Sequence, residues 1–217
     1  MEKKESYRSN LPHFQRPGQA YFVTWSLDDA VPPKALPYYS LKMATLQSNI
    51  QLAIKNKMDE KSINQLMTDY YIIRKKFMKA YEDLLHLEHK SIVNLSHPDN
   101  TQIVLDALCF WHGKRLQNHA ICVMSNHVHW VFKLYEKDAN NKPVYLQDIL
   151  QSVKRFSATD INHREGLKGT LWQKESWDTT IRDEKHLYNA IEYTKNNPVK
   201  AKLVSDWKDW KGTMVWE

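Results

Sequence analysis

The chain has 217 residues, 42% of them hydrophobic, and a formal net charge of +6 at pH 7. This length and composition allow one large domain with a proper core, and the positive charge favours polyanionic partners. With two cysteines and no run near the roughly 18 apolar residues of a membrane span, the sequence excludes a disulfide framework and a membrane helix.

The first residues and the cysteines predict a cytoplasmic protein. The opening "MEKKESYRSN" is charged and lacks the apolar core of a secretion signal. Cys109 and Cys122 each lie among apolar residues, so we expect buried free thiols, which suit a reducing compartment.

A basic arm and one strand are expected at the start of the chain. Residues 1–19 are polar and interrupted by prolines, which indicates an extended segment. Its basic residues include Lys3, Lys4, Arg8 and Arg16. The stretch "AYFVTWSL" at 20–27 is rich in β-branched and aromatic residues and lies between turn residues, which predicts a strand.

Residues 44–90 predict a helical hairpin. They contain no proline or glycine, and apolar residues recur at helical spacing between Leu46 and Leu85. The polar "KNKMDEKS" at 55–62 indicates a break between two helices. We expect this hairpin to act in packing or spacing and to carry no chemistry.

The middle of the chain predicts a helix and two adjacent strands. Residues 97–116 open with turn residues and continue at helical spacing. The stretches "HAICVMSN" at 119–126 and "HVHWVFKL" at 127–134 are typical of strands joined by a tight turn near Ser125 and Asn126.

Two further helices are expected in the last third. The apolar residues of 146–162 follow a helical period. The stretch "TLWQKESWDTTI" at 170–181 contains some strand. Asp183 is a candidate N-cap for a helix through "EKHLYNAIEYTKN", which Pro198 is expected to end.

The pair His127 and His129 is a candidate metal site. Side chains alternate between the two faces of a strand, so Val128 and Trp130 can face a core while both imidazoles share the other face. Their Cα atoms are then about 7 Å apart, and the rings can lean towards one divalent ion. Such an ion needs a further ligand from elsewhere. The alternative is an ordinary pair of surface histidines.

Tyr193 is a candidate nucleophile. At about 100° per residue, Ala190 and Thr194 fall on the core side of the last helix, and Tyr193 falls on a polar face with Asn197 one turn later. A phenol can form a covalent intermediate when a nearby cation offsets its charge, and the Asn197 amide could be the third metal ligand. The alternative is a surface tyrosine before a helix end.

Taken together, these stretches resemble the single-tyrosine HUH transposases, and among them the REP-associated tyrosine transposase-like group. HUH denotes His, a bulky hydrophobic residue and His, here "HVH" within "VMSNHVHWVF". The block "LWQKESWDTTIRDEKHLYNAIEYTKNNPVKAKLV" is similar to the family's Trp-Gln, Ile-Arg-Asp-Glu and Tyr-x-x-Asn-Asn-Pro-Val pattern, and "NLPHFQRPGQAYFVTWSL" to its opening strand.

The resemblance implies an α+β fold of the ferredoxin-like or RRM-like type. Its antiparallel sheet would carry the HUH strand, with helices on one face. The whole chain, 1–217, would then be a single HUH transposase-like domain, with 38–97 as a helical insertion between the opening strand and the next helix.

The resemblance also implies a reaction: metal-dependent, site-specific cleavage and rejoining of single-stranded DNA near hairpins such as REP-like palindromes. Tyr193 would become linked to the 5′-phosphate, and His127, His129 and Asn197 would hold Mg²⁺ or Mn²⁺. Imidazoles suit Mn²⁺ better than Mg²⁺, so both ions stay open. The implied protein is a cytoplasmic, nucleoid-associated monomer or homodimer with no membrane partner.

Basic residues near the motifs are candidates for contacts with DNA phosphates. Lys154 and Arg155 lie off the apolar stripe of their helix, Arg182 precedes the tyrosine helix, and Arg16 belongs to the basic arm. The alternative for each is an ordinary solvated charge.

Two other functions remain open on the sequence. One is a domesticated, non-catalytic DNA- or RNA-binding regulatory protein on the same sheet. The other is a metal hydrolase that uses the histidines and a water nucleophile, for which no nearby carboxylate offers an obvious base.

Overall fold

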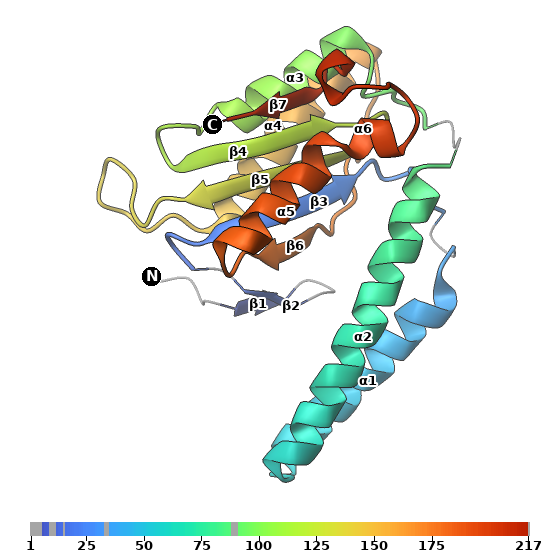
Figure 1. Ribbon diagram of the computed structural model, residues 1–217, viewed down its shortest axis with the longest axis vertical. Helices are drawn as coiled ribbons and strands as arrows, with labels where there is room; N and C mark the ends of the chain where they lie inside the picture. Colours follow the sequence, from blue (N-terminus) through green and yellow to red (C-terminus); the bar gives the residue numbers. More distant parts are fainter. Residues whose placement is uncertain (1–5, 9–11, 15, 33–34, 88–90, 217) are drawn as a thin grey trace. The chain divides into compact units, whose positions relative to one another are not determined.

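The computed structural model describes residues 6–8, 12–14, 16–32, 35–87 and 91–216. These residues form two compact units (Figure 1): one combines the described parts of 1–30 and 90–217, and the other contains those of 31–89. The single domain with an insertion at 38–97 stays a prediction. The candidate site residues that the structure describes all lie in the first unit.

The first unit is built on a five-stranded sheet in which neighbouring strands are antiparallel. In spatial order the strands are β6 (Trp177–Thr180), β3 (Ala20–Ser26), β5 (His127–Leu134), β4 (Leu116–Val123) and β7 (Thr213–Val215). This sheet with its helices confirms the predicted α+β fold class. The strand with the His-x-His motif is central and has a hydrogen-bonded neighbour on each side.

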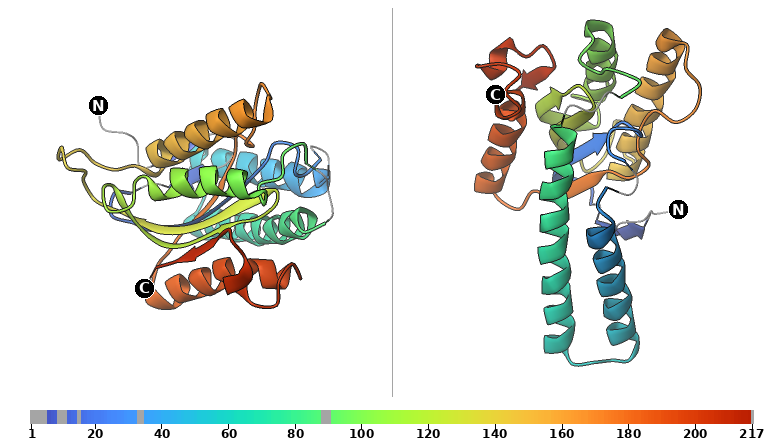
Figure 2. Two further views of the ribbon diagram at one scale, coloured as in Figure 1. Left: turned by 90° about the horizontal axis from the view of Figure 1, so that it is seen from above. Right: turned by 90° about the vertical axis from the view of Figure 1, so that its right-hand side faces the viewer.

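Helices lie on both faces of this sheet (Figure 2, left). On one face are α3 (Pro98–Cys109) and α4 (Leu146–Glu165), and on the other is α5 (Glu184–Lys195). The predicted layer on one face corresponds to α3 and α4, and the helix on the second face differs from that prediction. It lies there because its own apolar stripe is buried: Ala190 packs with Val131 of β5 and Ala120 of β4.

The two faces of β5 are both buried, in the alternation that the sequence predicts. Trp130 points towards α3 and α4, with its ring centroid 6.2 Å from that of Trp25. Its Nε1 donates a hydrogen bond to Asn118 Oδ1 at 2.8 Å, and Asn118 in turn donates to the Leu108 carbonyl of α3. The face with His127 and His129 therefore looks away from the α3–α4 layer.

Some predicted helix boundaries in this unit differ from the structure, for local reasons. The helix expected over 97–116 ends at Cys109, because turns follow and Gly113, at φ +73°, reverses the chain into β4. The tyrosine helix ends at Lys195, before Pro198. That proline instead lies in the first turn of α6 (Asn197–Lys200), where its missing N–H costs nothing.

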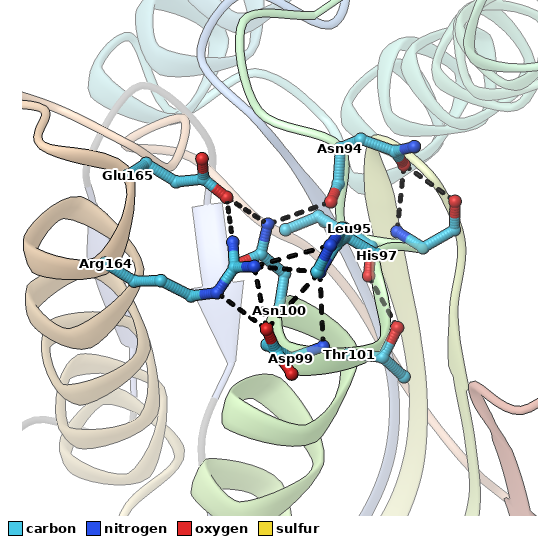
Figure 3. A network of polar contacts seen from close by, with 9 residues as sticks. Asn94, Leu95, His97, Asp99, Asn100, Thr101, Arg164 and Glu165 are labelled. Carbon is cyan, nitrogen blue, oxygen red and sulfur yellow. Dashed lines mark hydrogen bonds and ion pairs between the residues drawn. The ribbon is translucent and has the colours of Figure 1, made fainter.

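Arg164 ties the end of α4 to the start of α3 (Figure 3). Its guanidinium donates to Asp99 Oδ2 at 2.8 and 3.1 Å, to Asn100 Oδ1 at 3.3 Å and to His97 Nδ1 at 3.0 Å. It also pairs with Glu165, which accepts from Asn100 Nδ2 at 2.8 Å. This network joins the two helices that support the sheet from behind the site.

The second unit is a helical hairpin, as predicted, although it begins at Pro37 and ends at Leu85 rather than covering 44–90. It consists of α1 (Pro37–Lys55) and α2 (Glu60–Leu85), and Asp59 caps α2 by accepting from the Ser62 N–H at 2.9 Å. Gln47 of α1 donates to the Tyr70 hydroxyl of α2 at 3.0 Å. No helix within the described ranges is both long and apolar enough to cross a membrane.

The remaining elements are short. Within the basic arm, β1 (Ser6–Arg8) pairs with β2 (Pro12–Phe14) in an antiparallel two-stranded sheet. A 3₁₀ helix, η1 (Trp207–Asp209), leads from α6 towards β7. In the turn before β7, the Trp210 indole donates to the Val123 carbonyl at 2.8 Å, which fastens the end of the chain to β4.

Candidate metal centre and nucleophile

The two histidines of β5 turn their rings towards each other on the α5 side of the sheet. Their Nε2 atoms are 3.1 Å apart, and the ring planes are nearly perpendicular at 83°. Both side chains are only 1% exposed. They are therefore not an ordinary surface pair. The strand holds them in one buried arrangement.

The outer nitrogen of each ring is fixed by a partner from a neighbouring segment. His127 Nδ1 lies 2.7 Å from Asn126 Oδ1 in the turn before β5, and His129 Nδ1 lies 2.8 Å from the Thr24 hydroxyl of β3. Thr24 is directly opposite His129 in the β3–β5 register. Partners of this kind fix the orientation and tautomer of metal-binding histidines.

These partners permit two proton arrangements. Asn126 Oδ1 can only accept, so His127 Nδ1 carries a proton and its neutral ring presents a lone pair at Nε2. His129 Nε2–H can donate to that lone pair while its own Nδ1 accepts from Thr24. Because a hydroxyl both donates and accepts, Thr24 can instead accept from His129 Nδ1–H, which leaves both Nε2 lone pairs available to a cation.

The spacing of the two nitrogens fits ligation of one ion. Nitrogens about 2.1 Å from a shared ion, at angles of about 90–110°, are about 3.0–3.4 Å apart. Among the described residues no cluster of three or more His, Cys, Asp or Glu can hold a metal. The predicted third ligand, the Asn197 amide, is of another type and stays a prediction.

A buried cysteine lies on the strand next to the histidines. Cys122 of β4 is opposite His129 in the register, but its Sγ lies 3.5 Å from Met124 Sδ and from the Thr213 hydroxyl. Burial raises the pKa of the Cys122 thiol to about 12. Cys122 is thus the buried free thiol that the sequence predicts.

Tyr193 lies beside the histidine pair. Asp183 caps α5 as predicted, accepting from the His186 N–H at 2.7 Å, and the helix crosses the sheet with its apolar side inward. The Tyr193 ring centroid is 5.4 Å from that of His129, nearly perpendicular to it at 85°, and 5.6 Å from that of Phe22. The structure thus brings the candidate nucleophile next to the histidine pair within one chain, through the contact of Tyr193 with His129.

Asn197 is placed just beyond the tyrosine helix. It is fully buried and is the first residue of α6, after Asn196 has ended α5 with φ −88° and ψ 2°. It is therefore four residues after Tyr193 in sequence but not in the same helix. Its role as the third metal ligand stays a prediction.

Of the predicted phosphate contacts, those on α4 lie away from the histidines. α4 covers the opposite face of the sheet (Figure 2, left). Arg155 lines a groove along that helix with Phe156 and Thr159. Lys154 points inward: its ammonium donates to the carbonyls of Gln173, Glu175 and Lys174, at 3.0, 3.2 and 3.4 Å.

The surroundings of Lys154 indicate a structural role. Burial lowers the pKa of its ammonium to about 8, and the nearby Glu175 carboxylate partly opposes this shift. The loop that it holds runs alongside β3, where the Gln173 N–H donates to the Ser26 carbonyl at 3.0 Å. Its donors are therefore engaged by the chain in this structure.

The other two predicted phosphate contacts lie on the surface. Arg182 is exposed between β6 and α5, and Arg16 is exposed just before β3. Lys3 and Lys4 of the basic arm lie outside the described residues, whereas Arg8 belongs to β1. Of the four residues predicted to bind DNA, Arg182 is the one directly connected to the tyrosine helix.

Replacing Thr24 with valine is expected to weaken Mn²⁺ binding about 10–100-fold, because His129 Nδ1 loses the partner that orients its ring. Thr24→Ser keeps a hydroxyl and is expected to bind almost normally. Isothermal titration of each variant with Mn²⁺ measures the effect, and Thr179→Val on β6 is the matched control. An unchanged affinity of Thr24→Val for Mn²⁺ would show that Thr24 does not orient His129 for metal binding.

The chain is similar to proteins named REP-associated tyrosine transposases. One of them, from Haemophilus influenzae, carries the name as a provisional one. It is 32% identical to this chain over 98 residues, and the aligned region covers 42% of this chain and 54% of that protein. The chain is 33% identical over 92 residues to one from Escherichia coli, covering 41% and 50% respectively. The chain thus spans about half the length of the curated relatives it matches. No protein-family model matches it.

A solved structure has the same fold. It is described as a REP-associated tyrosine transposase bound to a REP hairpin, and its TM-score with this chain is 0.53 at 15% identity, covering 95% of this chain and 82% of the other. The sequence matches confirm the resemblance stated above, and the structural match confirms the fold.

Proposed function

From this resemblance and from the site, we propose that the protein cleaves and rejoins single-stranded DNA through a covalent bond to Tyr193. The observation that carries the proposal is the ring of Tyr193 against His129, 5.4 Å between centroids, beside two imidazole nitrogens that converge at 3.1 Å. A phenol next to a cation site is an arrangement suited to attack on a phosphodiester.

The proposed reaction is a phosphoryl transfer that conserves bond energy. The Tyr193 oxygen forms a bond to phosphorus, its proton passes to water, and the bond from phosphorus to the preceding 3′ oxygen breaks. That oxygen takes up a proton and becomes a free 3′-hydroxyl, whose later attack on the phosphotyrosine rejoins DNA. When bound by His127, His129 and Asn197, Mg²⁺ or Mn²⁺ would polarise a phosphate oxygen.

The proposed substrate is single-stranded DNA beside a hairpin. The hairpin-bound relative supports this choice, and the net charge of +6 suits a polyanion. We propose that Arg182 and Arg16 contact phosphates of the hairpin or of the single strand beside it. Because Tyr193 and His129 meet within one chain, one copy supplies both groups, and either a monomer or a homodimer can act. The protein is proposed to act in the cytoplasm, in association with the nucleoid.

The test is the formation of an adduct that survives SDS. Purified protein, with Mn²⁺ or Mg²⁺, is mixed with 3′-labelled single strands that carry palindromes from the neighbourhood of its own gene. Because the tyrosine retains the 5′-phosphate, the 3′-labelled fragment is expected to migrate with the protein, and EDTA is expected to prevent this.

The same assay separates the alternative functions. Salt-sensitive binding without any adduct would identify a non-catalytic DNA- or RNA-binding protein. Strand cleavage that leaves both fragments free, and persists when Tyr193 is changed, would identify a metal hydrolase with a water nucleophile. Either result would overturn the proposed strand transfer.

A further inference from the structure

A lysine lies over the ring of the candidate nucleophile. Lys200 Nζ, at the end of α6, is 5.1 Å from the centroid of the Tyr193 ring. Lys200 is exposed, whereas His129, another neighbour of that ring, is buried. The neighbours of the tyrosine ring therefore include a buried imidazole, from His129, and an exposed lysine, Lys200.

The nearest lysine on the tyrosine helix itself is engaged elsewhere. Lys195 Nζ pairs with the Glu192 carboxylate, and it lies 5.6 Å from the centroid of the Trp207 ring. The tyrosine helix α5 ends at Lys195. The next helix, α6, then places Lys200 over the Tyr193 ring. The cation at the nucleophile thus comes from the segment after the break.

A cation in this position suits the charge of the substrate. A phosphodiester carries one negative charge, and as the phenol oxygen bonds to phosphorus further negative charge develops on the non-bridging oxygens. The neutral imidazoles offer lone pairs and cannot offset that charge by themselves. An ammonium at the solvent side of the ring can reach a phosphate that enters from solvent.

We propose that Lys200 is a catalytic residue that binds the phosphate under attack by Tyr193 and stabilises its charge during transfer. The inference rests on the proposed function. Lys200 takes no part in the proton transfers: the tyrosine–phosphorus bond forms, the bond to the 3′ oxygen breaks, and the lysine side chain then stays next to the phosphotyrosine. It thereby favours the covalent intermediate as well as the step that forms it.

Replacing Lys200 with methionine tests the role, because methionine keeps the length of the side chain without its charge. Under single-turnover conditions, Lys200→Met is expected to form the adduct about 10–100-fold more slowly, and Lys200→Arg is expected to recover most of the rate. Lys211→Met, at an exposed lysine in the turn before β7, removes the same charge and is the matched control.

A substrate with a neutral linkage separates a role in charge stabilisation from a role in folding. A methylphosphonate at the cleaved position replaces one charged oxygen with a methyl group, so the ammonium has less charge to offset. The defect of Lys200→Met, relative to wild type, is expected to shrink at least about tenfold on one stereoisomer of this substrate.

Three results would decide against the role. Lys200→Met could react as fast as Lys211→Met, it could be slowed equally on both substrates, or Lys200→Arg could be as slow as the methionine variant. In each case wild-type protein would still form the adduct, so only the role of Lys200 fails. If wild-type protein forms no adduct, the proposed function itself fails.

Discussion

Tyr193→Phe is expected to abolish the covalent protein–DNA adduct, with a fall in rate of about 10³-fold or more. The change removes one hydroxyl and keeps the ring, so the contacts with His129 and Phe22, at 5.4 and 5.6 Å between centroids, remain available. DNA affinity is expected to change less than about threefold, because no charge is lost. Gel analysis after SDS gives the adduct, and fluorescence anisotropy gives the affinity.

Tyr188→Phe is the matched control. Tyr188 lies on the same helix and is 63% exposed, so loss of its hydroxyl tests the chemistry of the change without touching the site. An adduct in Tyr193→Phe at the rate of Tyr188→Phe would remove Tyr193 from the mechanism. Adduct formation by neither variant, with activity in wild type, would point to damage of the helix rather than of the nucleophile.

Replacing His127 and His129 together with alanine is expected to lower the rate of adduct formation by at least about 10³-fold at saturating Mn²⁺. The reason is that the change removes both Nε2 atoms, which lie 3.1 Å apart and are the proposed ligands of the cation. Rates measured against Mn²⁺ concentration show whether metal dependence is lost together with activity.

Because both rings are buried, these changes can also destabilise the fold. His129→Gln keeps a polar group next to Thr24, so it separates loss of metal binding from loss of structure. The melting temperature of every variant is measured together with its rate of adduct formation. His163→Ala, near the exposed end of α4, is the control for removal of an imidazole. A double variant with the wild-type rate and wild-type metal dependence would rule out this metal centre.

The elements of the site could be predicted because their signals are local. The alternation in β5 gives the shared face of His127 and His129, and the period of α5 puts Tyr193 off the apolar stripe. Both signals depend on residues only a few positions apart. Neither the alternation along β5 nor the helical period of α5 predicts that these three side chains meet. That prediction came from the family resemblance.

The supporting residues could not be predicted because they depend on the pairing of distant segments. Thr24 reaches His129 only through the register of β3 on β5, which joins residues 105 positions apart. Lys154 lies on the polar side of its helix in sequence, yet a loop 19–21 residues later folds over its ammonium. Phe22 of β3 likewise meets Tyr193 only when α5 packs on the sheet. Lys200 is close to Tyr193 in sequence, but it lies after the break between α5 and α6, which the sequence did not predict.

The position of α5 limits how a nucleic acid can approach. Domains of the RRM type bind single strands by stacking bases on an open sheet. Here the corresponding face is covered by α5, whose Ala190 packs on Val131 of β5. If a single strand binds at Tyr193 as proposed, its bases are not expected to stack on the strands beneath α5, because side chains of that helix already occupy this surface.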